Sequence, residues 1–137
     1  MSDEAREWLA YAEENLRMAT LAIESGLFNS CLQNSQQATE KALKAIGFAR
    51  GLPLKRTHSI RELRDDLAAT GFDPPLTDDD CDLMDSVYLP SKYPLGSALP
   101  RFDPDEGVTR QCLTIADRIV TTAENLLTPP QEQGPPE

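Results

Sequence analysis

The chain has 137 residues, enough for one domain whose hydrophobic core needs no disulfide framework. Its formal net charge of −10, from 23 acidic and 13 basic side chains, opposes binding to a phosphate backbone unless the basic residues are clustered. No apolar run approaches the ~18 residues that a membrane span requires, and the acidic start Met1–Glu4 is unlike a signal peptide, so we expect a cytoplasmic protein without membrane attachment.

Two long amphipathic helices are expected first, separated by Gly26. Apolar residues recur at spacings of three and four from Asp3 to Ser25, and again from Leu27 or Phe28 to Arg50. Ser2 is suited to cap the first helix. The second helix has an apolar stripe of mostly small residues, which favours close approach of another helix: Cys31, Leu32, Ser35, Ala38, Ala42, Ala45, Ile46 and Ala49.

Three further helices are expected, each with its own start signal. Ser59 and Glu62 form a capping box, in which each side chain satisfies the other residue's backbone amide, and the helix that follows is closed by Gly71. Residues 77–80 (Thr-Asp-Asp-Asp) cap a fourth helix that should stop near Pro90. Asp103, with proline at the next position, should cap a fifth helix that reaches Leu127.

No alternating strand pattern and no internal repeat occur, so the predicted fold is all-α with four to five helices. Residues 90–103 are rich in Pro, Gly and Ser and are typical of a long loop. Residues 129–137 are rich in Pro and Gln and are predicted to be a disordered tail. We therefore expect one helical domain over residues 1–128.

Basic residues are concentrated in one window, residues 41–64, where Glu62 is the only acid. The seven are Lys41, Lys44, Arg50, Lys55, Arg56, Arg61 and Arg64, and the single histidine, His58, lies among them. If the second and third helices pack side by side, these residues could line one groove for a phosphate, a nucleotide or an acidic partner. The alternative is a solvated face that pairs with some of the 23 acids.

The residue pattern indicates neither a metal site nor a cofactor. Asp78, Asp80 and Asp82 match the start of a calcium loop, but Leu83 and Leu89 stand where that loop needs Gly and Glu. An acidic helix N-terminus explains the run. The three cysteines are far apart, and those at positions 31 and 112 fall on apolar helical faces typical of a core.

Four segments, in order and at suitable distances, resemble motifs of the HEPN family. The segment 36–45 (QQATEKALKA) is similar to the family signature, 56–63 (RTHSIREL) to its Thr-His segment, and 8–16 (WLAYAEENL) to its first helix. Residues 91–94 (SKYP) lie where many members carry Arg-Tyr-Pro, with Lys92 in place of Arg. The resemblance extends over residues 5 to about 127.

The resemblance implies an up-and-down helical bundle that forms a homodimer. It also implies a minimal nucleotidyltransferase as partner, because many prokaryotic members form toxin-antitoxin-like pairs with one. Active toxins of the family are metal-independent ribonucleases with an Arg-x(4–6)-His motif. In this chain the arginine would have to occupy position 51, 52 or 53, where Gly51, Leu52 and Pro53 stand, so the motif is absent.

The leading hypothesis is a non-catalytic HEPN interaction and nucleotide-binding domain. Its anion-binding residues would be Lys41, Lys44, Lys55, Arg56, His58 and Arg61, with Lys92 and Tyr93 adding a cation and a stacking ring from the loop. Tyr93 could instead anchor that loop on the bundle. The alternative function is a ribonuclease toxin with a rearranged site centred on His58, and a third is a stand-alone nucleotide-binding domain. Alternatively, His58 has a structural role and supports the N-terminus of the third helix.

Overall fold

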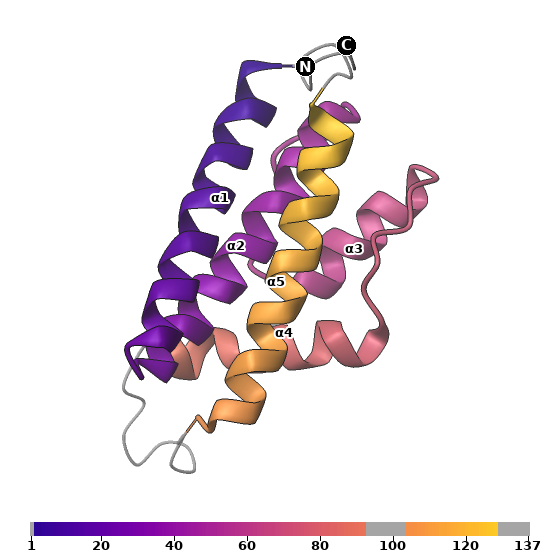
Figure 1. The fold of residues 1–137 in the computed structure, drawn as a ribbon. Coiled ribbons are helices and arrows are strands. Elements are labelled where there is room, and N and C mark those ends of the chain that lie inside the picture. Colours follow the sequence, from indigo (N-terminus) through magenta and orange to yellow (C-terminus); the bar gives the residue numbers. More distant parts are fainter. Residues whose placement is uncertain (1, 93–103, 129–137) are drawn as a thin grey trace, which may run out of the picture.

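A computed structural model describes residues 2–92 and 104–128, which form five α-helices and no strand (Figure 1). The helices are α1 (Asp3–Glu24), α2 (Phe28–Ala49), α3 (Ile60–Ala69), α4 (Asp78–Lys92) and α5 (Glu106–Leu127). The predicted all-α class is confirmed. The predicted tail and Tyr93 lie outside the described residues.

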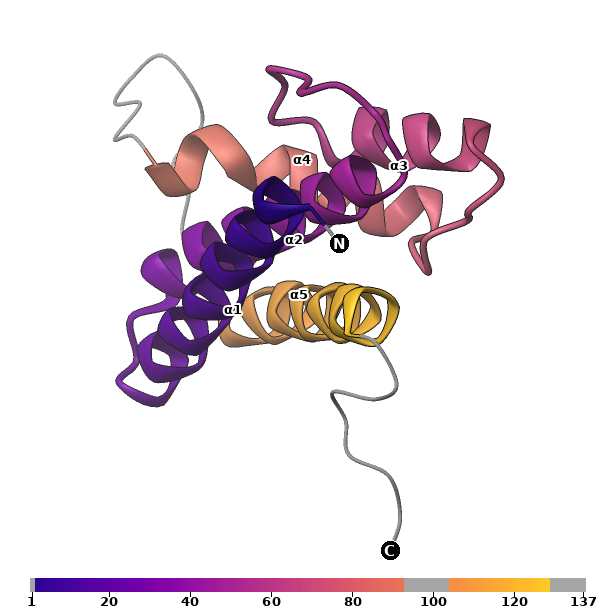
Figure 2. The same ribbon diagram turned by 90° about the horizontal axis from the view of Figure 1, so that it is seen from above.

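The three long helices form the body of the molecule, and the two short ones pack on one side of it. Helices α1, α2 and α5 run side by side, with α4 packed across α2 and α5 near one end (Figure 1). Seen from above, α3 and α4 lie on one side of α2, and α5 lies on the other (Figure 2). Helix α2 is therefore central and is in contact with all four other helices.

Small residues allow α2 to take this central position. Ala38, Ala42 and Ala45 are fully buried, which lets neighbouring helices approach the α2 backbone closely. The larger core side chains that surround them include Leu32, Leu43, Ile46, Ile60, Leu67, Met84, Ile119 and Val120. The predicted stripe of α2 is thereby confirmed over most of its length.

The helix ends follow local signals with three exceptions. Ser2 caps α1 and accepts a hydrogen bond from the Ala5 amide at 3.2 Å, and Gly71, with a φ of 95°, follows the last turn of α3. Helix α4, however, continues through Pro90 to Lys92. The missing proline amide removes a single helical hydrogen bond, which is tolerated in the last turn. Helix α5 is capped by Asp105, whose side chain accepts from the Val108 amide at 2.8 Å, so the expected Asp103 cap was wrong.

The third exception is the capping box predicted at the start of α3, of which only one half forms. Ser59 Oγ accepts from the Glu62 amide at 3.2 Å, as predicted. The Ser59 amide instead donates to Thr57 Oγ1 at 3.1 Å, while the Glu62 carboxylate lies 3.5 Å from Lys55 Nζ. Thr57 thus takes the place of Glu62 at the Ser59 amide, and Asp85 of α4 adds a second cap by accepting from the Ile60 amide at 2.6 Å and from Ser59 Oγ at 3.1 Å.

The acidic run at residues 78–80 begins α4 and is held by basic side chains. Asp78 pairs with Arg64 at 2.8 Å and with Arg61 at 3.1 Å, and Asp80 pairs with Arg118 at 3.0 Å. The hydrogen bond from Arg64 is the main reason why the pKa of Asp78 is lowered. Residues 2–92 and 104–128 contain no cluster of three or more His, Cys, Asp or Glu side chains placed to hold a metal ion.

In the same described ranges, none of the helices is both long and apolar enough to cross a membrane.

Candidate functional site at His58

A row of polar side chains lies along one face of α2 and is sealed from solvent. Gln36, Glu40 and Lys44 follow one another at intervals of four residues, so they stack along the helix, and all three are buried. Glu40 is only 3% exposed. A buried carboxylate is stable only when it is paired and hydrogen-bonded, so its partners define the site.

Glu40 is bound on both carboxylate oxygens. Oε2 accepts from Lys44 Nζ at 2.9 Å, and Oε1 lies 3.0 Å from His58 Nδ1. Gln36 Nε2 approaches Oε1 at 3.4 Å and also donates to the His58 carbonyl oxygen at 3.1 Å. Glu40 and Gln36 together fix both the ring and the backbone of His58.

The imidazole of His58 lies at the boundary between core and solvent. Its side chain is 55% exposed and stacks on the Tyr88 ring of α4, with centroids 4.5 Å apart and planes 16° apart. The carboxylate beside Nδ1 favours the tautomer that carries its proton there. Nε2 has no hydrogen bond within the described residues, which leaves this nitrogen for a ligand.

Aromatic rings lie against Lys44 and against His58. Lys44 Nζ lies 5.3 Å from the centroid of the Trp8 ring, and Trp8 stacks on Phe48 at 6.3 Å. Tyr88, which stacks on His58, lies with its ring centroid 5.4 Å and its hydroxyl 3.4 Å from Lys92 Nζ. The cation–π contact with Trp8 offsets part of the cost of burying Lys44.

Most of the predicted basic residues are engaged by acids. Lys55 pairs with Asp66 at 3.1 Å, and the hydrogen bond that it donates to Asp66 is the main cause of its raised pKa. Arg61 pairs with Asp78 and Asp82, and the hydrogen bond that it donates to Asp82 raises its pKa. Surface pairs of this kind are weak and can be exchanged for a ligand.

The structure does not bring all the predicted residues into one groove. Lys41 turns toward α1, where Nζ donates to Asn15 Oδ1 at 2.8 Å and lies 5.8 Å from the Tyr11 ring. Burial lowers the pKa of Lys41. Lys44 is buried against Glu40. Near His58 this leaves Lys55, Arg56, Arg61 and Lys92 on the surface.

Arg56 differs from its neighbours. It is exposed, and within the described residues it makes neither a hydrogen bond nor an ion pair, although it is only two positions from His58. The other basic residues of the 41–64 window all have such a partner. An exposed guanidinium two residues from a fixed imidazole is suited to contact an anion.

A cavity of about 310 Å³ opens next to the polar row, between α2, α3 and the segment that joins them. Lys44, Lys55 and Asp66 form the polar edges of the cavity. The other lining residues are mainly apolar: Leu43, Gly47, Phe48, Leu52, Pro53, Leu54, Leu63 and Leu67. The volume is at the lower end of the range for small-molecule sites. Lys44 thus connects the cavity to Glu40 and His58.

Sequence reasoning missed Glu40, Gln36 and Tyr88 as site residues. The spacing of Glu40 and Lys44 is that of a helical ion pair, and this was the available signal. The burial of Glu40 depends on how α1 and α4 cover α2, which no local sequence pattern shows.

The chain matches the HEPN domain model over residues 5–126. The crystal structure of TT1696 from Thermus thermophilus is 30% identical, with a TM-score of 0.75, and the match covers 92% of this chain and all of that one. The crystal structure of ST0689, an archaeal HEPN homologue, is 26% identical with a TM-score of 0.69, over 93% of this chain and all of the other. None of the curated proteins matches it. The segments around Glu40 and His58 therefore lie in a chain that belongs to the HEPN family.

Proposed function

We propose that this HEPN protein is a non-catalytic, cytoplasmic binding module that receives the phosphate of a nucleotide or RNA at His58 and Arg56. It would act as a homodimer together with a minimal nucleotidyltransferase. The partner and the dimer are suggested by family resemblance alone. The phosphate site has support from the residues themselves.

One observation carries this proposal. His58 is fixed through Nδ1 at 3.0 Å from the buried Glu40, about half of its side chain is exposed, and the unpaired Arg56 is two positions away in the chain. Such a site can present an imidazole Nε2 and a guanidinium to an anion without the entropic cost of ordering the imidazole. Lys55, which is held by surface ion pairs, could exchange them for the same anion.

The neighbouring cavity supports a nucleotide rather than a bare phosphate as ligand. Its apolar walls suit a flat ring, and Lys55 lies both at its edge and next to Arg56 in the chain. A base in the cavity and a phosphate near Arg56 would use both features. The absence of an arginine at positions 51–53 argues against cleavage.

Thermal unfolding with a panel of nucleotides and short RNAs tests the proposal, because a ligand that binds only the folded state raises the melting temperature. Arg56→Glu should abolish the increase. Arg6→Glu is the matched control, since Arg6 is also exposed and without an ion pair within the described residues but lies at the start of α1. No stabilisation by any nucleotide or RNA, or equal stabilisation of both variants, would refute the phosphate site. Co-purification of a nucleotidyltransferase tests the partner separately.

A second function, ribonuclease activity, is favoured by the Glu40–His58 hydrogen bond. A carboxylate that orients an imidazole is the arrangement a general base requires. RNA cleavage that is lost in His58→Ala, with the circular dichroism spectrum and melting temperature unchanged, would support the enzyme. Binding without cleavage would support the module.

A further inference from the structure

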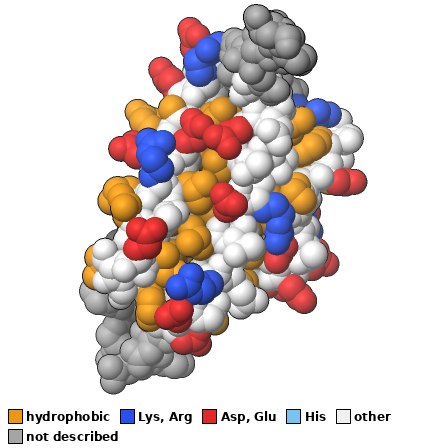
Figure 3. Space-filling model, viewed as in Figure 1, with side chains coloured by type: hydrophobic (Ala, Val, Ile, Leu, Met, Phe, Trp, Pro, Cys, Tyr) orange, Lys and Arg blue, Asp and Glu red, His pale blue; other side chains and the backbone are white. Residues whose placement is uncertain are grey.

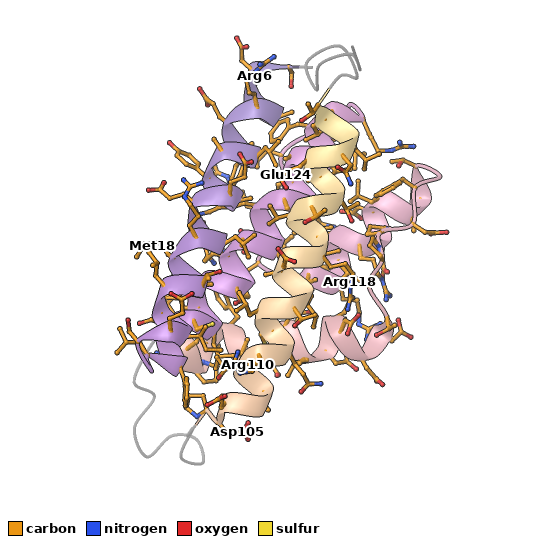
Figure 4. All side chains as sticks on the ribbon, viewed as in Figure 1. Arg6, Met18, Asp105, Arg110, Arg118 and Glu124 are labelled. Atoms are coloured by element: carbon orange, nitrogen blue, oxygen red, sulfur yellow. The ribbon has the colours of Figure 1, made fainter. Side chains whose placement is uncertain are left out.

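Helices α1 and α5 expose apolar side chains that the proposed function at His58 does not account for. Tyr11, Met18 and Leu21 of α1 are 58%, 50% and 59% exposed. Figure 3 shows hydrophobic side chains gathered along the line between α1 and α5, with charged side chains around them. Figure 4 places Met18 on the outer edge of α1, away from α5, so of these three residues Leu21 is the one that borders α5. Exposed apolar side chains that gather between two helices are typical of an interaction site.

A groove runs along this face. It has a volume of about 550 Å³, with an apolar floor from Leu16, Leu21 and Leu113. Arg17 and Asp117 lie at its rim, and neither makes an ion pair within the described residues. A groove between two antiparallel helices with leucines at its base matches the apolar side of another helix.

Two carboxylates meet at one end of the groove. Glu13 lies one helical turn before Arg17 on α1, and Glu124 lies two turns after Asp117 on α5. A hydrogen bond with Glu13, then burial, then the negative charge of Glu13 raise the pKa of Glu124 to about 7. No lysine or arginine of the described residues forms an ion pair with either acid.

The charge of the surface around the groove indicates what kind of partner would bind there. Helix α1 carries six acidic and two basic side chains, and none of these is in an ion pair within residues 2–92 and 104–128. The acids of α3 and α4 by contrast are largely paired with Arg61, Arg64 and Arg118. A second copy of this face would bring unpaired acids together, whereas a basic partner would neutralise them.

We propose that the groove between α1 and α5 binds an amphipathic helix of a partner protein, with apolar side chains over Leu16, Leu21 and Leu113 and a lysine or arginine against Glu13 and Glu124. The inference does not depend on what His58 binds, because α5 and the α3–α4 pair lie on opposite sides of α2 (Figure 2).

The probe is a synthetic helical peptide of roughly four turns, with leucines on one side and lysines on the other, compared with a version in which glutamates replace the lysines. NMR titration of the full chain should shift the signals of Leu16, Leu21 and Leu113 with the lysine peptide only. Leu21→Asp should weaken binding by about tenfold or more, since it removes a buried apolar contact. Glu13→Gln with Glu124→Gln should weaken it several-fold, whereas the control Glu4→Gln with Glu7→Gln, which changes two acids outside the groove, should not.

Four results would overturn the proposal. The first is that the lysine peptide shifts no NMR signal of the groove residues. The second is that the Glu13→Gln/Glu124→Gln variant and the Glu4→Gln/Glu7→Gln control lose the same affinity, which would indicate general attraction of the peptide to an acidic surface. The third is a dimer by analytical ultracentrifugation that Leu21→Asp converts to a monomer, because a second copy would then cover this face. The fourth is retained affinity in Leu21→Asp with the melting temperature unchanged.

Discussion

Glu40 and His58 share a hydrogen bond of 3.0 Å that joins the core to the surface. Glu40 is nearly inaccessible and His58 is half-exposed, so the bond crosses the boundary of the protein. The negative charge of Glu40 is balanced inside by Lys44 at 2.9 Å. The carboxylate can therefore orient the imidazole without being left as an uncompensated buried charge.

Removing the charge of Glu40 should destabilise the fold strongly. Glu40→Gln leaves the Lys44 ammonium buried without its ion pair, a change that typically costs about 3–5 kcal/mol. The double variant Glu40→Gln with Lys44→Met should recover much of the loss, because no buried charge then remains. Urea unfolding followed by circular dichroism measures both. A single variant as stable as the double one would show that Lys44 reaches solvent.

Asp85 should be a strong stabiliser of the segment that carries His58. Its carboxylate accepts from the Ile60 amide, Ser59 Oγ and the Arg61 amide at 2.6–3.3 Å, so Asp85→Ala leaves the Ile60 and Arg61 amides without this acceptor. We expect a loss of about 1–2 kcal/mol. Amide hydrogen exchange should accelerate at residues 59–62 more than in α5. Uniform acceleration would contradict a local role.

The Glu13–Glu124 pair should make the protein more stable as the pH falls from about 7 toward the ordinary range of a glutamate. The folded state holds a proton on Glu124, whose pKa is raised to about 7, that the unfolded chain has released. Stability therefore decreases as the pH rises through this window. Glu124→Gln should flatten this dependence and raise the melting temperature at pH 8 by about 1–3 °C. Melting curves from about pH 5 to 8 test it, with Glu7→Gln as control, which should keep the slope of the wild type.

The three cysteines should be unreactive in the folded protein. Burial is the main reason why the pKa of Cys112 is raised to about 12, and burial also raises the pKa of Cys31 and Cys81. Little thiolate is present near neutral pH, and a thiol-reactive reagent cannot reach the buried sulfur atoms. An aromatic disulfide reagent should label no cysteine in buffer and all three cysteines in guanidinium. Rapid labelling of one thiol in buffer would mean that its helix opens locally.

Local signals were sufficient to predict that the five helices exist and to predict the bounds of the first two. The apolar periodicity of residues 3–25 and 28–50 predicted α1 and α2 to within one residue at each end, because side chains three and four apart share a helix face whatever lies opposite. Ser2 and Ser59 act as caps since a side chain needs only its own first turn to do so. The family likewise was apparent from the segments around Glu40 and His58.

The tertiary structure decided which charged side chains are buried, which are paired and which are exposed. Lys44 and Arg56 are both basic residues of one window, yet Lys44 is buried against Glu40 and Arg56 is exposed without a partner among the described residues. Asp85 caps a helix that begins 25 residues earlier in the chain, and Glu13 meets Glu124 near the opposite end of the sequence. The physical reason is that burial and electrostatic partnership depend on which helices cover which faces. Helix formation depends on residues within a turn or two, so the chain by itself determined the helices, and their packing decided which charges are available for binding.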